Sequence, residues 1–294
     1  MRRKFLSFIL PNKGDSKGEI VRKIIFIVLF VVLIICVVNI SDYYISSYLN
    51  AKENKHLKSI YNSSSAVTNL SSKNSRYPSA MLQNFYSLYD ANSDIKGWII
   101  IPNTLINYPV VETSDNSYYL SKGFDKADDR HGTLFLDYRD NINPISQNLI
   151  IYGHEMQDGQ MFHSIRNYAK VYFYNSSPII TFNTLYSNDK WKVFAAFIAN
   201  TVPRQGYVFN YLITNFSTSN DFTSFINEVK ARSLIKTSVD INPSDTLLTL
   251  STCTYELPEA RFVVMARRVR EGESLEVDKG VINKNHLGPT KPMK

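Results

Sequence analysis

The sequence predicts a mostly β domain, an antiparallel barrel with peripheral helices, preceded by one N-terminal transmembrane helix. Three observations support this fold class. Fifteen uninterrupted apolar residues run from Ile24 to Val38. Between residues 80 and 270, eight short runs are dominated by β-branched and aromatic residues, which favour strands. Helical patterns are fewer there and do not alternate regularly with the strands, which disfavours a doubly wound parallel sheet.

The apolar run is long enough to cross a bilayer. From Ile20 to Ile40 a helix would measure about 31 Å at roughly 1.5 Å per residue, and the hydrocarbon core measures about 30 Å. Basic residues precede the run, which predicts a cytoplasmic segment over 1–23, an uncleaved signal anchor over 24–40 and export of the rest. The alternatives are a cleaved signal peptide and a buried core helix. However, no small-x-small cleavage site follows the run, and the run has no polar face.

The remaining chain divides into three predicted segments. Residues 41–79 are rich in Ser, Asn and Lys; a helix could continue over 52–57, but the later part predicts a flexible extracellular stalk. Residues 80–270 form the folded domain. Residues 271–294 are polar, with Gly and Pro near the end, and predict a loose tail.

The elements of the folded domain follow from local patterns. The predicted strands are 97–102, 108–113, 132–137, 148–153, 179–184, 190–200, 246–253 and 261–269. Helical patterns cover 80–91, 160–170 and 220–234. The last pattern places Phe222, Phe225, Ile226 and Val229 on one face, so we expect that face to be buried.

Charge is unevenly distributed along the chain. The formal net charge of +7 consists of +5 over 1–23, +3 over 41–79, −1 over 80–270 and zero over 271–294. The segment able to fold is therefore near neutral and lacks the basic surface expected of a nucleic-acid-binding domain. The 294 residues can bury a core without disulfide or metal staples, and an apolar content of 44% excludes global disorder.

The two cysteines cannot pair, because Cys36 lies in the membrane helix and Cys253 in the exported domain. A single thiol facing an oxidising exterior is a candidate reactive thiol, although a buried structural cysteine is the alternative. Cys253 ends the apolar strand TLLTLSTC, where strands expose side chains to clefts. A short connection over 255–260 would place Arg261 across from Cys253, where a guanidinium favours the thiolate and can stabilise an oxyanion.

A cysteine nucleophile usually needs a proton shuttle. His154 follows the apolar strand NLIIYG, the same placement that Cys253 has in its own strand. Taken alone, a histidine here is more often an ordinary surface residue than a proton shuttle. The segment HEMQD that begins at His154 resembles a zinc-binding HExxH helix, but its fifth residue is Asp and it follows a strand. We therefore expect no metal and no cofactor.

Together these residues resemble the sortases. The basic resemblance rests on TLSTC at 249–253, Arg261 eight positions later and YGH ending at His154. The wider set resembles class B sortases over about residues 80–270. It comprises GWI at 97–99, YPVV at 108–111, Asp115-Asn116, Tyr118-Tyr119-Leu120, GTLFLDYRD at 132–140, QNLIIYGHEMQDGQMF at 147–162 and the helical segment 220–234.

The resemblance implies a closed eight-stranded sortase-type barrel and a membrane-anchored cysteine transpeptidase outside a Gram-positive cell. Such an enzyme cleaves the C-terminal sorting signal of a surface protein after Thr, holds the product as a thioester and transfers it to an amine of a lipid II-type peptidoglycan precursor. By the same resemblance, Cys253 is the nucleophile and His154 the general acid/base. Arg261 would position the substrate carbonyl and stabilise the oxyanion.

Six further residues are candidate substrate contacts by resemblance, and ordinary packing is the alternative for the last four. They are Asn116, Leu120, Tyr152, Ser251, Tyr211 and Leu212. Two other functions stay open at this point. One is a membrane-tethered cysteine peptidase that passes its acyl-enzyme to water; the other is a non-catalytic cell-surface binding protein with an inert Cys253.

Overall fold

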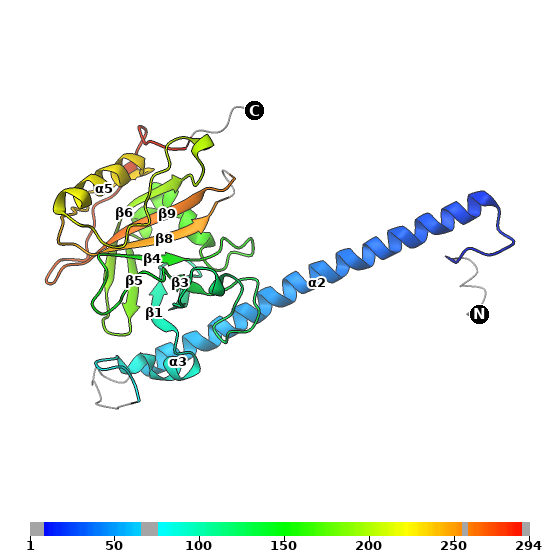
Figure 1. Ribbon diagram of the computed structural model, residues 1–294, viewed down its shortest axis with the longest axis horizontal. Coiled ribbons are helices and arrows are strands. Elements are labelled where there is room, and N and C mark those ends of the chain that lie inside the picture. The colour runs from blue at the N-terminus through cyan, green and yellow to red at the C-terminus, as the bar shows by residue number, and fades with distance from the viewer. Residues whose placement is uncertain (1–8, 66–75, 255–257, 290–294) are drawn as a thin grey trace. The chain divides into compact units, whose positions relative to one another are not determined.

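The computed structural model describes residues 9–65, 76–254 and 258–289 (Figure 1). The chain divides into two compact units, residues 1–49 and 50–294. The helix α2 (Lys17–Ser65) supplies most of the first unit. It begins with a capping box, in which the Glu19 N–H donates to Ser16 Oγ and the Ser16 N–H donates to the Glu19 carboxylate, both at 3.3 Å. With a mean hydropathy of 3.3 in its most apolar window, α2 is long and apolar enough to cross a membrane.

The C-terminal end of α2 differs from the expected flexible stalk. The helix continues to Ser65, and in the second unit its residues Leu57 and Tyr61 are buried. The Tyr61 ring stacks on the Trp98 ring with the centroids 4.5 Å apart. The expectation is wrong for 58–65 because two apolar side chains four residues apart form one helical face that packs on the barrel. The rest of the predicted stalk, up to residue 75, lies outside the described residues.

The second unit contains a closed eight-stranded barrel, which confirms the predicted fold class. Its strands follow the order β1-β2-β3-β4-β8-β9-β6-β5, and β5 pairs with β1 to close it. Their bounds are β1 (Ile95–Ile100), β2 (Asn107–Val111), β3 (Leu134–Leu136), β4 (Asn148–Tyr152), β5 (Ile179–Thr184), β6 (Lys190–Ala199), β8 (Leu247–Cys253) and β9 (Arg261–Arg268). Only β2–β3 and β4–β8 pair in parallel; the other neighbours are antiparallel. Every predicted strand is present, with its ends within about two residues of the prediction.

Helices surround the barrel. They are η1 (Gln83–Phe85), α3 (Tyr86–Ala91), η2 (Tyr118–Leu120), η3 (His163–Ala169), α4 (Val171–Ser176), η4 (Pro203–Gln205) and α5 (Ser219–Arg232). The helix predicted over 160–170 is a 3₁₀ helix, η3, and the one over 80–91 is shorter, divided between η1 and α3. In α5 the predicted apolar face is buried against β6 and β9, beside which the helix lies in Figure 1. The Thr218 hydroxyl caps α5 by accepting from the Asp221 N–H at 3.1 Å.

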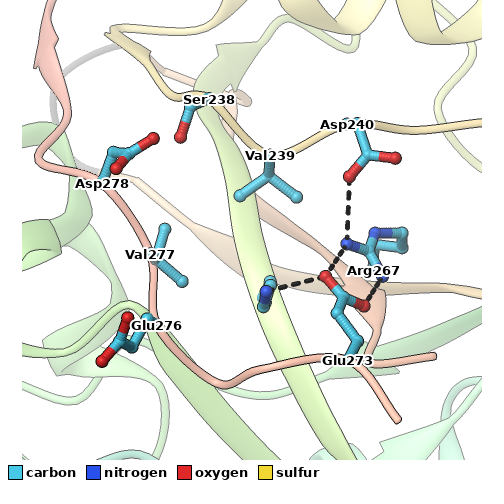
Figure 2. Close-up of a pocket in the computed structure, with 9 residues that line it drawn as sticks. Ser238, Val239, Asp240, Arg267, Glu273, Glu276, Val277 and Asp278 are labelled. Atoms are coloured by element: carbon cyan, nitrogen blue, oxygen red, sulfur yellow. Dashed lines mark hydrogen bonds and ion pairs between the residues drawn. The ribbon is translucent and has the colours of Figure 1, made fainter. Parts of the chain in front are cut away.

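The C-terminal segment is packed on the barrel, so the expectation of a loose tail is wrong for its described residues. β10 (Val281–Ile282) pairs with β7 (Ile235–Lys236). Glu273 accepts two hydrogen bonds of 2.6 Å from the fully buried Arg267 of β9 (Figure 2). It also accepts one of 2.7 Å from Lys192. The polar composition of this tail suggested disorder, but a buried guanidinium needs a carboxylate, and the tail supplies it.

Candidate active site

Strands β8 and β9 bring Cys253 and Arg261 together at one end of the barrel. The two residues are partners in the last pair of the antiparallel ladder, as the short connection predicted. Cys253 is exposed, although every other residue of β8 is buried. Arg261 is half-buried, and its guanidinium donates to the Ala260 carbonyl at 3.1 Å. No ion pair joins it to a carboxylate among the described residues, which exclude 255–257 of the connecting hairpin.

The parallel pairing of β4 with β8 carries His154 to the same end. Tyr152, the last residue of β4, is the register partner of Ser251, and Gly153 still bonds to β8, so the chain brings His154 to the end of β8 that carries Cys253. The structure therefore brings together the three residues predicted to act as nucleophile, acid/base and oxyanion donor. They come from the ends of three adjacent barrel strands, β4, β8 and β9.

Gly153, which directly precedes His154, allows the chain to lie close against β8. Its N–H donates to the Ser251 carbonyl at 3.3 Å, and its carbonyl accepts from the Thr252 hydroxyl at 2.7 Å. A Cβ atom at this position would lie 2.3 Å from the Leu134 side chain and 2.9 Å from that of Phe162. Only glycine fits here without moving the core, so the local packing fixes the path of the backbone that presents His154.

The imidazole of His154 is oriented by a backbone carbonyl. Its Nε2 lies 2.7 Å from the Leu120 oxygen, which can only accept, so Nε2 carries a proton. In the neutral ring Nδ1 is then the nitrogen left to accept a proton. The Leu120 carbonyl is itself held against Gly132, whose φ is +61° and whose missing Cβ would lie 2.9 Å from the Leu120 oxygen.

Asp137 connects several of the predicted positions, although it is not among the residues that the sequence predicts for the site. Its buried carboxylate accepts from the Asn116 amide at 3.0 Å, from the Tyr152 hydroxyl at 2.8 Å and from the Arg139 guanidinium at 2.7 and 2.8 Å. Burial raises the pKa of Asp137, but the hydrogen bonds from Arg139 and Tyr152 outweigh it and hold that pKa below its usual range. The sequence did hold a signal, because Asp137 follows an apolar strand as His154 does.

The chain matches one family in sequence and in structure. A sortase-domain family model matches residues 99–269. Sortase B of Staphylococcus aureus (strain NCTC 8325 / PS 47) is 35% identical over 188 residues, which are 63% of this chain and 75% of that protein. Sortase B of Listeria monocytogenes serovar 1/2a is 31% identical over 219 residues, 74% of this chain and 87% of that protein. The chain is a class B sortase.

The solved Staphylococcus aureus sortase B–substrate complex is similar to this sortase over the whole domain. The TM-score is 0.68 at 29% identity, with 78% of this chain and 100% of that chain covered. The likeness covers more of the chain than the residues 99–269 that the family model matches. This sortase is therefore a sortase B-like cysteine transpeptidase.

In this sortase the segment before α5 contacts Ser251 of β8 and Arg139, which bonds to Asp137. The Tyr211 and Ser251 hydroxyls lie 2.9 Å apart, and both side chains are buried. Burial raises the pKa of Tyr211, and the nearby charge of Arg261 lowers it to a smaller extent. The Leu212 carbonyl accepts from Arg139 at 3.2 Å. Of the six predicted substrate contacts, Leu120 has an exposed side chain, Asn116, Tyr152 and Leu212 are half-buried, and Tyr211 and Ser251 are buried.

Proposed function

We propose that this class B sortase is anchored in the membrane, cleaves a C-terminal sorting signal after Thr and transfers the product to an amine of a lipid II-type peptidoglycan precursor. One observation carries the proposal: an exposed thiol, Cys253, lies across from an arginine free of described carboxylate partners and at the same end of the barrel as a histidine that follows the neighbouring strand. A protein in which Cys253 had a structural role would bury it with the rest of β8.

In the proposed mechanism the Cys253 thiolate attacks the Thr carbonyl carbon. The S–C bond forms and charge develops on the carbonyl oxygen, where the open N–H donors of Arg261 stabilise it. The C–N bond then breaks, and the leaving amine takes a proton from the His154 ring. In the second half the acceptor amine attacks the thioester, gives its proton back to the imidazole and releases Cys253.

The proposed substrate cleft is built around the Asp137 cluster. Leu120 offers an exposed apolar side chain, and Asn116 and Tyr152 border the cleft while bonded to the Asp137 carboxylate. Leu212 adds an apolar contact, and the mutual hydrogen bond between Tyr211 and Ser251 shapes the wall behind it. The relative solved as a substrate complex supports a substrate site in this fold.

The proposed topology follows from α2. Residues 1–23 are cytoplasmic, residues 24–40 form the anchor and the catalytic domain over 80–270 is extracellular on a Gram-positive cell. Its partners are then surface proteins that carry a sorting signal and the peptidoglycan precursor. Both are available at the outer face of the membrane. The near-neutral domain gives no support to a nucleic-acid partner.

Cleavage of a degenerate peptide library by the full-length protein in detergent tests the proposal. With an added amine, mass spectrometry should detect an amide-linked product that retains the residues up to Thr, and a Cys253 acyl-enzyme. Hydrolysed product alone, at every amine concentration, would favour the tethered peptidase. Absence of cleavage together with no labelling of Cys253 by a methanethiosulfonate reagent would favour the binding protein.

A further inference from the structure

His131 is a fully buried histidine between two carboxylates. Its Nδ1 lies 3.0 Å from Asp129 Oδ1 and its Nε2 lies 2.7 Å from Asp158 Oδ2, and its side chain has no exposed surface. An ionised carboxylate can only accept hydrogen bonds, so both ring nitrogens donate and the ring is an imidazolium. None of the three proposed catalytic groups contacts it, so the catalytic mechanism leaves this buried charge unexplained.

The surroundings of His131 favour its charged form. Burial lowers the pKa of His131, but the hydrogen bonds and charges of Asp129 and Asp158 raise it by more, so the net shift is upward from 6.5. Burial likewise raises the pKa of Asp129, and the bonds from His131 and Asn50 reverse that shift, so the carboxylate stays ionised. The three groups therefore form a compact anion–cation–anion unit.

Other titratable groups near this unit are mostly acidic or neutral. Glu53 of α2 has a pKa raised by burial and then by the charges of Asp125 and Asp129. Tyr108 of β2, near Asp158, has its pKa raised to about 12 by burial and stays neutral. The nearby cation Lys122 pairs instead with Asp128 at 2.7 Å. His131 forms ion pairs with both Asp129 and Asp158 in this acidic region.

Asp158 ties His131 to the segment that carries His154. Residues 154–162 form a tight loop, in which the His154 carbonyl accepts from the Phe162 N–H at 2.9 Å. Asp158 lies at the turn of this loop, and its Oδ1 accepts from the Gln160 N–H at 3.1 Å. The loop therefore leaves β4 at His154, reaches His131 through Asp158 and returns to the core.

Asp129 and the backbone of His131 connect the His131 side chain to the Leu120 carbonyl, which orients His154. Asp129 Oδ1 also accepts from the His131 N–H at 2.9 Å, and the next residue, Gly132, packs directly against the Leu120 carbonyl. That carbonyl accepts the His154 Nε2 proton. His131 thus connects the two features that set the imidazole in place, its loop and its hydrogen-bond acceptor.

We propose that His131, clamped as an imidazolium between Asp129 and Asp158, is a positioning residue that holds the His154 loop in the geometry needed for proton transfer. This rests on the proposed acid/base role of His154. Deprotonation of His131 removes one of the two hydrogen bonds and leaves two half-buried carboxylates facing a neutral ring. Because the folded-state pKa is raised, the clamp is complete below about pH 6.5 and is lost as the pH rises through the folded pKa.

The test compares His131→Gln with the matched control His286→Gln in the full-length protein in detergent. Glutamine keeps polar atoms at position 131 but cannot donate to both carboxylates as a cation. We expect kcat to fall by about 10- to 100-fold with little change in KM, because the reacting group is misplaced while the cleft persists. Amide hydrogen exchange over 154–162 should accelerate in His131→Gln and stay at the wild-type rate in His286→Gln.

A second measurement covers the case in which His131→Gln does not fold. In the wild-type protein, exchange over 154–162, corrected for its intrinsic pH dependence, should accelerate between about pH 6 and about pH 9, and Asp158→Asn should show faster exchange at every pH. Unchanged exchange and kcat in a folded His131→Gln, or protection that does not respond to pH in the wild type, would overturn the clamp. Absence of any transpeptidation by the wild type would instead overturn the proposed function.

Discussion

Two of the three arginines of strand β9, Arg261 and Arg267, lie near opposite ends of the strand and have opposite surroundings. Arg267 is fully buried and donates to Glu273 through both terminal nitrogens at 2.6 Å, with Asp240 at 3.4 Å (Figure 2). Arg261 is half-buried and donates to a single backbone carbonyl within the described chain. A guanidinium surrounded by carboxylates stabilises the fold, whereas one with open donors beside an exposed thiol is available to a substrate.

One end of the barrel therefore contributes to stability and the other to the reaction. Burying the Arg267 charge is unfavourable unless carboxylates neutralise it, and the C-terminal segment supplies Glu273 for that purpose. At the other end, Cys253 is exposed, and Arg261 bonds to a backbone carbonyl but to no carboxylate among the described residues, so both side chains are available to a substrate. Substitutions at the Cys253 end should therefore change activity, and those at the Arg267 end should change stability.

The largest expected effect is that of Cys253→Ala. We expect complete loss of the acyl-enzyme and of transpeptidation, because no other described thiol of the catalytic domain can replace the nucleophile. Stability should be unchanged, since the side chain is exposed. Mass spectrometry of the enzyme with a sorting-signal peptide measures acyl-enzyme formation and transpeptidation, and thermal unfolding measures stability. Cys36→Ala is the control and should behave as wild type; residual amide product in Cys253→Ala would contradict the nucleophile assignment.

Arg261→Lys and Arg267→Met test the comparison directly. Lysine cannot reproduce the fork of donors, so Arg261→Lys should lower kcat/KM by about 100-fold or more, with thermal stability unchanged. Arg267→Met removes one partner of a buried ion pair and should lower the free energy of unfolding by about 3 kcal/mol, with normal kcat/KM in the folded fraction. If the two variants exchanged these phenotypes, the division between the two ends would be wrong.

Most of this fold could be predicted because its signals are local. Runs of β-branched and aromatic residues identified each barrel strand, and a short hairpin was enough to pair Cys253 with Arg261. His154 was predicted because it follows an apolar strand, as Cys253 ends one, and because YGH resembles the sortases; the structure adds that the two strands are neighbours. Such signals depend on residues adjacent in sequence or on the alternation of a single strand.

The parts that the sequence did not predict depend on long-range polar pairing. Asn116 and Tyr152 lie 21 and 15 residues from Asp137, and Asp158 lies 27 residues from His131, so no spacing rule connects these partners. Glu273 is an ordinary acidic residue in a polar tail until the fold buries Arg267 beside it. Polar composition alone does not distinguish a solvated segment from one that neutralises a buried charge.

Asp137 and Asp140, near the site, also differ in their surroundings, and their pKa values are shifted in opposite directions. Asp137 is held ionised by Arg139, whereas burial raises the pKa of Asp140 to about 8. Asp137→Asn should lower kcat/KM by about 10-fold, because the cleft residues bonded to it lose their charged acceptor. Asp140→Asn resembles the protonated acid and should leave kcat/KM unchanged. Steady-state kinetics on both variants measures this; equal losses would show that the Asp137 charge has no special role.

The smallest expected effect is the pH dependence of stability at the Arg267 end. The hydrogen bonds from Arg267 hold the pKa of Glu273 well below its ordinary value of 4.5. A carboxyl with a depressed folded-state pKa stabilises the fold above its unfolded pKa, and that contribution is lost as the pH falls toward the folded value. Glu273→Gln should therefore lower the free energy of unfolding by about 1–2 kcal/mol near pH 7 and by less near pH 3. Urea unfolding of the two proteins at both pH values measures the difference. If Glu273→Gln lowered the free energy of unfolding equally at both pH values, Glu273 would contribute by packing rather than by its charge. That result would weaken the contrast between the two arginines.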